Sequence, residues 1–175
     1  MTERCTYPDC KCPFDAPADP TWCARGLPRV SRAKVVAEAR SWIGTPWQHQ
    51  ARTKGAGVDC AGLVIGVARA LGLVPADMDI THYTRMPDGS LLDHCSRWMS
   101  RISAPSLIRP ADVLVLDLGC GPQHLAIAAD YTHGGLSMIH AMDCQDRRRA
   151  RVVEHRLDSP TRERLSAAYR LPGIA

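Results

Sequence analysis

The pattern of hydrophobic and polar positions changes midway along the chain and predicts helices before strands. Apolar residues recur at three- and four-residue spacing from Val35 to Ile43, which is the period of one face of an α-helix. Ser31 precedes this run and is a residue type that caps helix N-termini, and Gly44 follows it. These positions predict the first helix.

The most hydrophobic segment lies in residues 61–72, with the sequence AGLVIGVARALG. It is apolar on nearly every face and ends at Gly72, so it predicts a buried central helix. Residues 48–58 before it are polar and contain glycine, and we expect a loop there. A third helix is expected over residues 90–101.

Beyond Pro110 the apolar residues alternate or form short runs separated by turn residues, as in β-strands. Residues 167–173 are expected to add a fifth strand after a helical turn that starts at Ser159. Helices followed by a meander predict an α+β domain over residues 31–175. The four strands of the expected antiparallel sheet are DVLVLDL (112–118), HLAIAAD (124–130), LSMIHAM (136–142) and RVVEHRL (151–157).

Residues 1–30 form a separate, cysteine-rich arm that shows neither helical nor strand periodicity. Four thiolates are the number that tetrahedral zinc binds, so a structural zinc site is the first expectation for this arm. An iron–sulfur cluster and the absence of any metal are the alternatives. The four candidate ligands are Cys5, Cys10, Cys12 and Cys23.

Composition narrows the function classes. The chain has 175 residues, of which 45% are hydrophobic, so it can bury a core. Its net charge of +4 is mild and only 5% of its residues are aromatic, which argues against a nucleic-acid partner. No apolar run approaches the roughly 18 residues of a membrane span. The first residues lack a signal-peptide core, so we expect synthesis in the cytoplasm without a signal peptide.

One cysteine outside the arm stands at a position suited to chemistry. Asp59 occupies the expected N-cap of the central helix, which places Cys60 in its first turn. The helix dipole and the free N–H groups of that turn favour a thiolate. A small apolar residue at a helix end is the alternative reading of Cys60, so a nucleophile also requires a partner base.

Two histidines can supply that partner. A nucleophilic cysteine needs an imidazole that exchanges protons and a third polar group that orients it. His124 begins one predicted strand and His140 lies near the end of the next, so one hairpin can place both rings on one face. The histidines without motif context, which we expect on the surface, are His82, His94, His133 and His155.

Several segments together make the sequence recognisable. GTPWQHQ, GAGVDCAGLV, RPADVLVL, QHLAI and MIHA occur in this order, and their combination resembles the NlpC-type branch of papain-like cysteine peptidases. The resemblance covers residues 31–173. It is closest to the tail peptidases of phages and gene-transfer agents, which share the GTP-aromatic-x-HQ segment, the DC-x-GL helix start and an AAYRLP-like final strand. It implies a papain-like α+β core of helices packed on an antiparallel sheet.

The resemblance also implies roles for individual residues. Cys60 would be the nucleophile, His124 the base and then the acid, and His140 the orienting third residue. Trp47 stands where the family usually has a tyrosine that helps to stabilise the oxyanion, so its indole N–H is a tentative replacement. His49 is expected near the cleft, mainly in a structural role.

The implied function is a peptidoglycan endopeptidase of a phage-like tail tip that cleaves stem peptides, with the bond between D-glutamate and the diamino acid as target. Its partners would be the stem peptide and tail-tip proteins. Its place would be the virion tail, delivered to the periplasm and cell wall, and catalysis would need no cofactor. The alternatives are an amidase or acyltransferase that uses the same Cys60 and His124, and a tail-tip structural subunit with a vestigial site.

Overall fold

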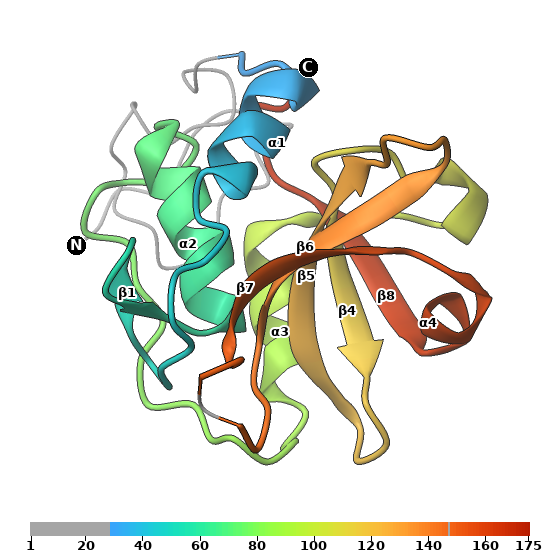
Figure 1. Ribbon diagram of the computed structural model, residues 1–175. Helices are drawn as coiled ribbons and strands as arrows, with labels where there is room; N and C mark the ends of the chain where they lie inside the picture. The colour runs from blue at the N-terminus through green and yellow to red at the C-terminus, as the bar shows by residue number, and fades with distance from the viewer. Residues whose placement is uncertain (1–28, 147) are drawn as a thin grey trace.

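Figure 1 shows the computed structural model, which describes residues 29–146 and 148–175. Helices come first and most of the sheet follows, so the predicted α+β class is confirmed. The helices of the described residues are α1 (Arg32–Arg40), α2 (Cys60–Ala70), α3 (Ser90–Trp98) and α4 (Ser159–Glu163), and η2 (Pro105–Leu107) is a 3₁₀ turn.

Among the described residues, six strands form one antiparallel sheet in the order β3-β8-β4-β5-β6-β7. The four predicted strands of the meander are present, and the predicted fifth strand, β8, pairs with the first of them, β4. The strands are β3 (Ser100–Arg101), β4 (Val113–Asp117), β5 (Pro122–Asp130), β6 (Leu136–Met142), β7 (Arg151–Arg156) and β8 (Leu165–Arg170).

Three local predictions need correction. The first helix ends at Arg40 rather than at Ile43, and a turn carries the chain to Gly44. The third helix ends at Trp98, because residues 100–101 form β3 and pair with the distant β8. The expected loop at residues 48–58 contains a small hairpin of β1 (Arg52–Thr53) and β2 (Gly57–Val58).

Alternate residues of the sheet belong to two separate hydrophobic clusters. Val113 and Val115 of β4 pack in the cluster that contains α1 and α2. Leu114 and Leu116 point to the other face, where they pack in the second cluster with residues such as Ile108. The central strands are buried on both faces, which explains why β4 reads as a continuous apolar run.

The positions of the helices around the sheet determine where the candidate site begins. In Figure 1, α1 and α2 lie together on one side of the strands, and α4 lies on the far side beside β8. Helix α2 contacts β5 and β6, the two strands that carry His124 and His140. The N-terminus of α2 therefore faces the histidine-bearing hairpin.

The described domain includes Val30, one residue before the predicted start at residue 31, and the division into an arm and a domain stays a prediction. Val30 is 6% exposed and forms a parallel bridge with Ile174, so it already belongs to the folded domain. The four cysteines of the predicted metal site lie outside the described residues, and the metal stays a prediction. They are Cys5, Cys10, Cys12 and Cys23.

Candidate active site

Cys60 is the first residue of α2, and the residue before it caps the helix. Asp59 has extended backbone geometry, and its carboxylate Oδ1 accepts the N–H of Gly62 at 2.8 Å. This contact satisfies one of the free donors of the first turn. The cap fixes the direction in which the chain enters α2 and so the position of the Cys60 side chain.

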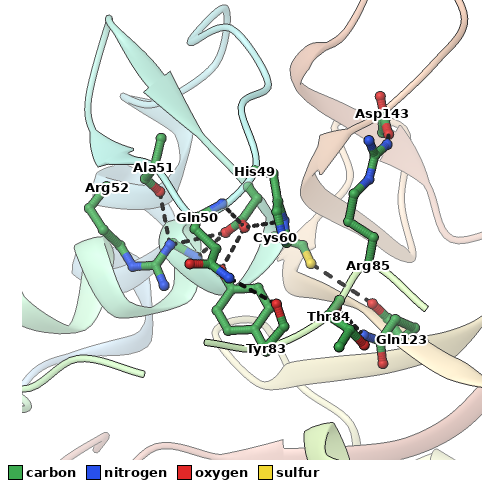
Figure 2. Close-up of polar contacts among 12 residues, drawn as sticks. His49, Gln50, Ala51, Arg52, Cys60, Tyr83, Thr84, Arg85, Gln123 and Asp143 are labelled. Carbon is green, nitrogen blue, oxygen red and sulfur yellow. Dashed lines mark hydrogen bonds and ion pairs between the residues drawn. The ribbon is translucent and has the colours of Figure 1, made fainter. Parts of the chain in front are cut away.

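The Asp59 carboxylate is also the centre of a polar cluster, and Figure 2 labels three of its partners, Gln50, Arg52 and Tyr83. It is 2% exposed, and its Oδ2 accepts the backbone N–H of Gln50 at 2.6 Å and the hydroxyl of Tyr83 at 2.5 Å. Its Oδ1 also accepts a guanidinium N–H of Arg52 at 3.2 Å. Asp59 thus joins the loop before α2, the hairpin β1–β2 and the segment after α2.

The Cys60 sulfur lies against the first residues of β5. It is 4.0 Å from the carbonyl oxygen of Gln123, and a hydrogen bond from the backbone N–H of Leu125 favours its thiolate form. Burial raises the pKa of the thiol to about 11, and the N–H of Leu125 opposes that rise only in part. The helix-start argument predicts a lowered pKa, whereas burial of the Cys60 thiol acts in the opposite direction.

His124 and His140 meet as their positions on neighbouring strands predict. His124 Nε2 and His140 Nδ1 are 2.8 Å apart, and the two rings are nearly perpendicular at a centroid distance of 4.9 Å. Burial lowers the pKa of His124 to about 4. Burial also lowers the pKa of His140 to about 3, with further lowering by its two histidine neighbours. Both rings are neutral at pH 7.

The contact between the histidines decides which nitrogen of His124 is available. Its Nε2 is engaged by His140, so Nδ1 is its other ring nitrogen, and Cys60 lines the same cavity as His124. A neutral thiol can attack an amide carbon while its proton passes to a neutral imidazole in the same step. The arrangement suits a nucleophile and general base that form no ion pair beforehand.

Two histidines expected on the surface have contacts in the site. His155 is exposed, but its Nδ1 lies 3.1 Å from Nε2 of His140. His94 is half-buried and lines the cavity. His155 is exposed as expected and His94 is not, and the contacts of both were missed because nothing in the primary sequence relates them to His124.

A cavity of about 370 Å³ opens in front of Cys60 and His124. Residues 83–85 form part of its wall and are held at three points, as Figure 2 shows. Gln50 Nε2 donates to the carbonyl of Tyr83 at 2.8 Å, and Gln123 Nε2 donates to the carbonyl of Thr84 at 2.8 Å. Arg85 forms an ion pair with Asp143, beyond the end of β6.

Trp47 and His49 line the same cavity. The Trp47 ring lies 4.8 Å below the Arg85 guanidinium and is stacked 6.4 Å from the His49 ring. His49 Nδ1 is 3.5 Å from Asp59 Oδ2. Both residues therefore form the wall of the cleft, and an oxyanion role for the Trp47 indole stays a prediction.

The other residues of the cleft were not predicted from the sequence. Tyr83, Arg85 and Gln123 line the cavity, yet they lie in a segment without periodicity or at a strand start. These residues are recognised by their long-range contacts, which form only when the chain folds. Within residues 29–146 and 148–175, no group of three or more His, Cys, Asp or Glu residues is arranged to hold a metal ion. In the same ranges no helix has the length and hydropathy to cross a bilayer.

Sequence comparison yields no relative, because no family model and no curated protein matches the chain. Solved structures resemble it. The NlpC/p60 domain of the peptidoglycan hydrolase SagA matches with a TM-score of 0.52 and 24% identity, over 80% of this chain and 98% of that chain. An NlpC/P60 family protein from Bacillus cereus matches with a TM-score of 0.59 and 18% identity, over 85% of this chain and 43% of that chain.

NlpC2 from Trichomonas vaginalis gives a similar result, with a TM-score of 0.56 and 16% identity over 80% of this chain and 47% of that chain. This chain thus spans less than half of the last two proteins and nearly all of the SagA domain. The described residues have the papain-like fold of NlpC/P60 domains.

Proposed function

We propose that this protein is a cysteine peptidase that hydrolyses amide bonds in peptidoglycan stem peptides. One observation carries the proposal. Cys60, at the start of α2, lines the same cavity as His124 and His140, whose rings are hydrogen-bonded to each other. The similarity of fold to the NlpC/p60 domain of a peptidoglycan hydrolase supports the choice of substrate.

The first half of the reaction begins with the neutral pair. As the Cys60 sulfur attacks the amide carbon, its proton passes to Nδ1 of His124, and the carbonyl oxygen becomes an oxyanion. The backbone N–H of Cys60 is one candidate donor to that oxyanion. The C–N bond then breaks, and the His124 imidazolium gives its proton to the departing amine. A thioester on Cys60 remains.

The second half restores the enzyme. His124 accepts a proton from a water molecule as the water oxygen attacks the thioester carbon. The C–S bond breaks, the acid product leaves, and the proton returns to Cys60. His140 orients the His124 ring in both halves through the 2.8 Å contact with its Nε2.

We further propose that Arg85 binds a carboxylate of the stem peptide. Its side chain is 51% exposed and lines the cavity, and it forms an ion pair with Asp143 in the structure. A substrate carboxylate can replace Asp143 as its partner, since a guanidinium binds either with the same geometry. This supports cleavage next to D-glutamate, whose α-carboxylate is free in that linkage.

The place of action is proposed from the sequence segments that resemble tail peptidases. GTPWQHQ, the DC-x-GL helix start and the AAYRLP strand support a tail-tip protein of a phage-like particle. Its partners would be other tail-tip proteins, and the virion would deliver it to the periplasm and cell wall.

The test is incubation of purified protein with defined muropeptides and identification of the fragments by mass spectrometry. We expect fragments cut between D-glutamate and the diamino acid. Cys60→Ala should abolish them, whereas Cys120→Ser, at an exposed cysteine on the rim of the same cavity, should leave them unchanged. Intact muropeptides with folded wild-type protein would contradict the proposal and favour a structural tail subunit.

A second function is favoured by the lining of the cavity away from Cys60. Val64, Leu91 and Met99 line it with other apolar side chains from α2 and from α3 and its flanks. Such a surface suits an apolar acyl group, and the same Cys60 and His124 can transfer or hydrolyse one. Release of p-nitrophenol from octanoyl ester but no muropeptide cleavage would indicate this acyl hydrolase or acyltransferase.

A further inference from the structure

A third imidazole continues the line of histidines beyond the pair used in the proposed mechanism. His124 Nε2 lies 2.8 Å from His140 Nδ1, and His140 Nε2 lies 3.1 Å from His155 Nδ1. The second pair of rings has a centroid distance of 5.1 Å. The line runs across β5, β6 and β7, from the cavity to the surface.

Strand register places His155 beside His140. His140 stands opposite Val153 and Met138 stands opposite His155, so the two histidines are diagonal neighbours on one face. His140 is 6% exposed, whereas His155 is exposed to water. The surface end of the line can therefore exchange protons with solvent.

The charged neighbours of His155 along β7 have other partners. Glu154 accepts a hydrogen bond from Arg40 at 2.9 Å and one from Ser137 at 2.6 Å. Arg156 lies over the Tyr131 ring at 5.8 Å. Of the titratable side chains with described contacts, His140 is the one that meets the His155 ring.

The two contacts restrict the protons of the line to two arrangements. A neutral imidazole has one N–H donor and one acceptor nitrogen, and each contact needs one proton between its two nitrogens. Either every ring donates outward, toward His155, or every ring donates inward, toward Cys60. A mixed arrangement would leave two acceptors or two donors facing each other.

Only the outward arrangement leaves a base at the cavity. In it, Nε2 of His124 donates to His140, Nε2 of His140 donates to His155, and Nδ1 of His124 is free to accept a proton from Cys60. In the inward arrangement Nδ1 of His124 already carries the proton, so it can accept none. The tautomer of His155 at the surface thereby decides whether Nδ1 of His124 carries a proton.

We propose that His155 is a positioning residue that accepts a hydrogen bond from His140 and thereby keeps Nδ1 of His124 unprotonated. The inference rests on the proposed role of His124.

The first measurement reads the tautomers directly by long-range ¹H–¹⁵N NMR of the histidine rings. In the wild-type protein we expect His124 and His140 to be protonated on Nε2. His155→Leu removes the acceptor and should mix the tautomers, while His155→Asn, whose amide oxygen can accept from His140, should restore them. His133→Leu, at an exposed histidine in the β5–β6 turn, is the matched control.

The second measurement is kcat and KM for muropeptide hydrolysis by the same variants. His155→Leu should lower kcat by about 2- to 10-fold with KM unchanged, the effect of one lost hydrogen bond. His155→Asn, whose amide oxygen can accept from His140, should recover most of kcat.

Two results would overturn the proposal. The first is a wild-type His140 protonated on Nδ1 at the pH of highest activity, and the second is a His155→Leu protein with wild-type tautomers and kcat. If no form of the protein cleaves muropeptides, the proposed function fails, and the NMR tautomers alone still decide the role of His155.

Discussion

The two sides of the cavity are held by different kinds of contact. On the helix side the buried carboxylate of Asp59 joins several segments, whereas on the sheet side three histidine rings form a line of hydrogen bonds. Asp59 accepts hydrogen bonds from Gly62, Gln50, Tyr83 and Arg52, which come from four places in the chain. On the sheet side, His140 contacts two other imidazoles, one on each neighbouring strand.

The difference shows two ways to fix a reactive group. A buried carboxylate needs many donors, and those donors fix the loops that supply them. A line of imidazoles needs only one proton for each contact, and burial keeps His124 and His140 neutral at pH 7. The helix side therefore determines shape, and the sheet side determines where a proton can go.

The largest expected effect lies on the helix side. Asp59→Ala removes the helix cap, worth about 1 kcal/mol, and leaves buried donors unpaired at about 1–3 kcal/mol each. The melting temperature should fall by roughly 6–12 °C for about 3 kcal/mol. Asp77→Ala, at an exposed aspartate in the turn after α2, is the control and should change little. A wild-type melting temperature for Asp59→Ala would contradict the role of Asp59 as the hub.

The next effect concerns the protonation state of Cys60. With a pKa of about 11, the thiolate fraction at pH 7 is small and increases about tenfold for each pH unit up to that value. The alkylation rate with iodoacetamide should follow this increase without a plateau at low pH. His124→Ala should leave the profile in place. A plateau between pH 4 and 8 that His124→Ala removes would instead show an ion pair, formed because dipole and imidazolium outweigh burial.

A smaller effect is expected at Arg85, which belongs to the rim and to neither of the two sides. Arg85→Ala should increase KM for a muropeptide with a free α-carboxylate by roughly 10-fold, the value of one charged hydrogen bond, and leave kcat unchanged. The effect should vanish for the α-amidated muropeptide. Arg101→Ala, at an exposed arginine on β3, is the control. Equal KM values for both variants would rule out carboxylate binding by Arg85.

Substitutions in the arm, residues 1–30, should have the smallest effect on the helix side and the sheet side of the cavity. We propose that residues 1–30 bind about one zinc ion per chain, or an iron–sulfur cluster, through their four cysteines. Replacing Cys10 and Cys12 by Ser should remove the metal, as measured by elemental analysis, and leave the melting of the domain unchanged. Metal-free wild-type protein prepared without chelator would contradict this proposal.

Much of the site was predictable because its signals are local. The apolar segment 61–72 and the residue before it predict a capped helix, and the position of Cys60 follows from that. His124 and His140 were predicted together because the two strands that carry them follow each other in one hairpin. A helix cap and a hairpin can be predicted from short segments because neither depends on distant parts of the chain.

The long-range contacts of the cleft have no local signal. Tyr83 and Arg85 lie in an irregular segment, and only the fold brings their side chains to Asp59 and Asp143. His155 gains a role only through the register of β7 on β6. Periodicity also gave the ends of the third helix imperfectly, because the pairing of β3 with β8 ended it early.

The sequence by itself determined the order of the elements, the cap at Asp59 and the three residues that meet at the cavity. The tertiary structure alone decided the electrostatics of those residues. A helix start favours a thiolate at Cys60, but the degree of burial set by β5 and the loops favours the neutral thiol. Hydrophobic periodicity is a property of the chain, whereas desolvation depends on every segment that packs around a group.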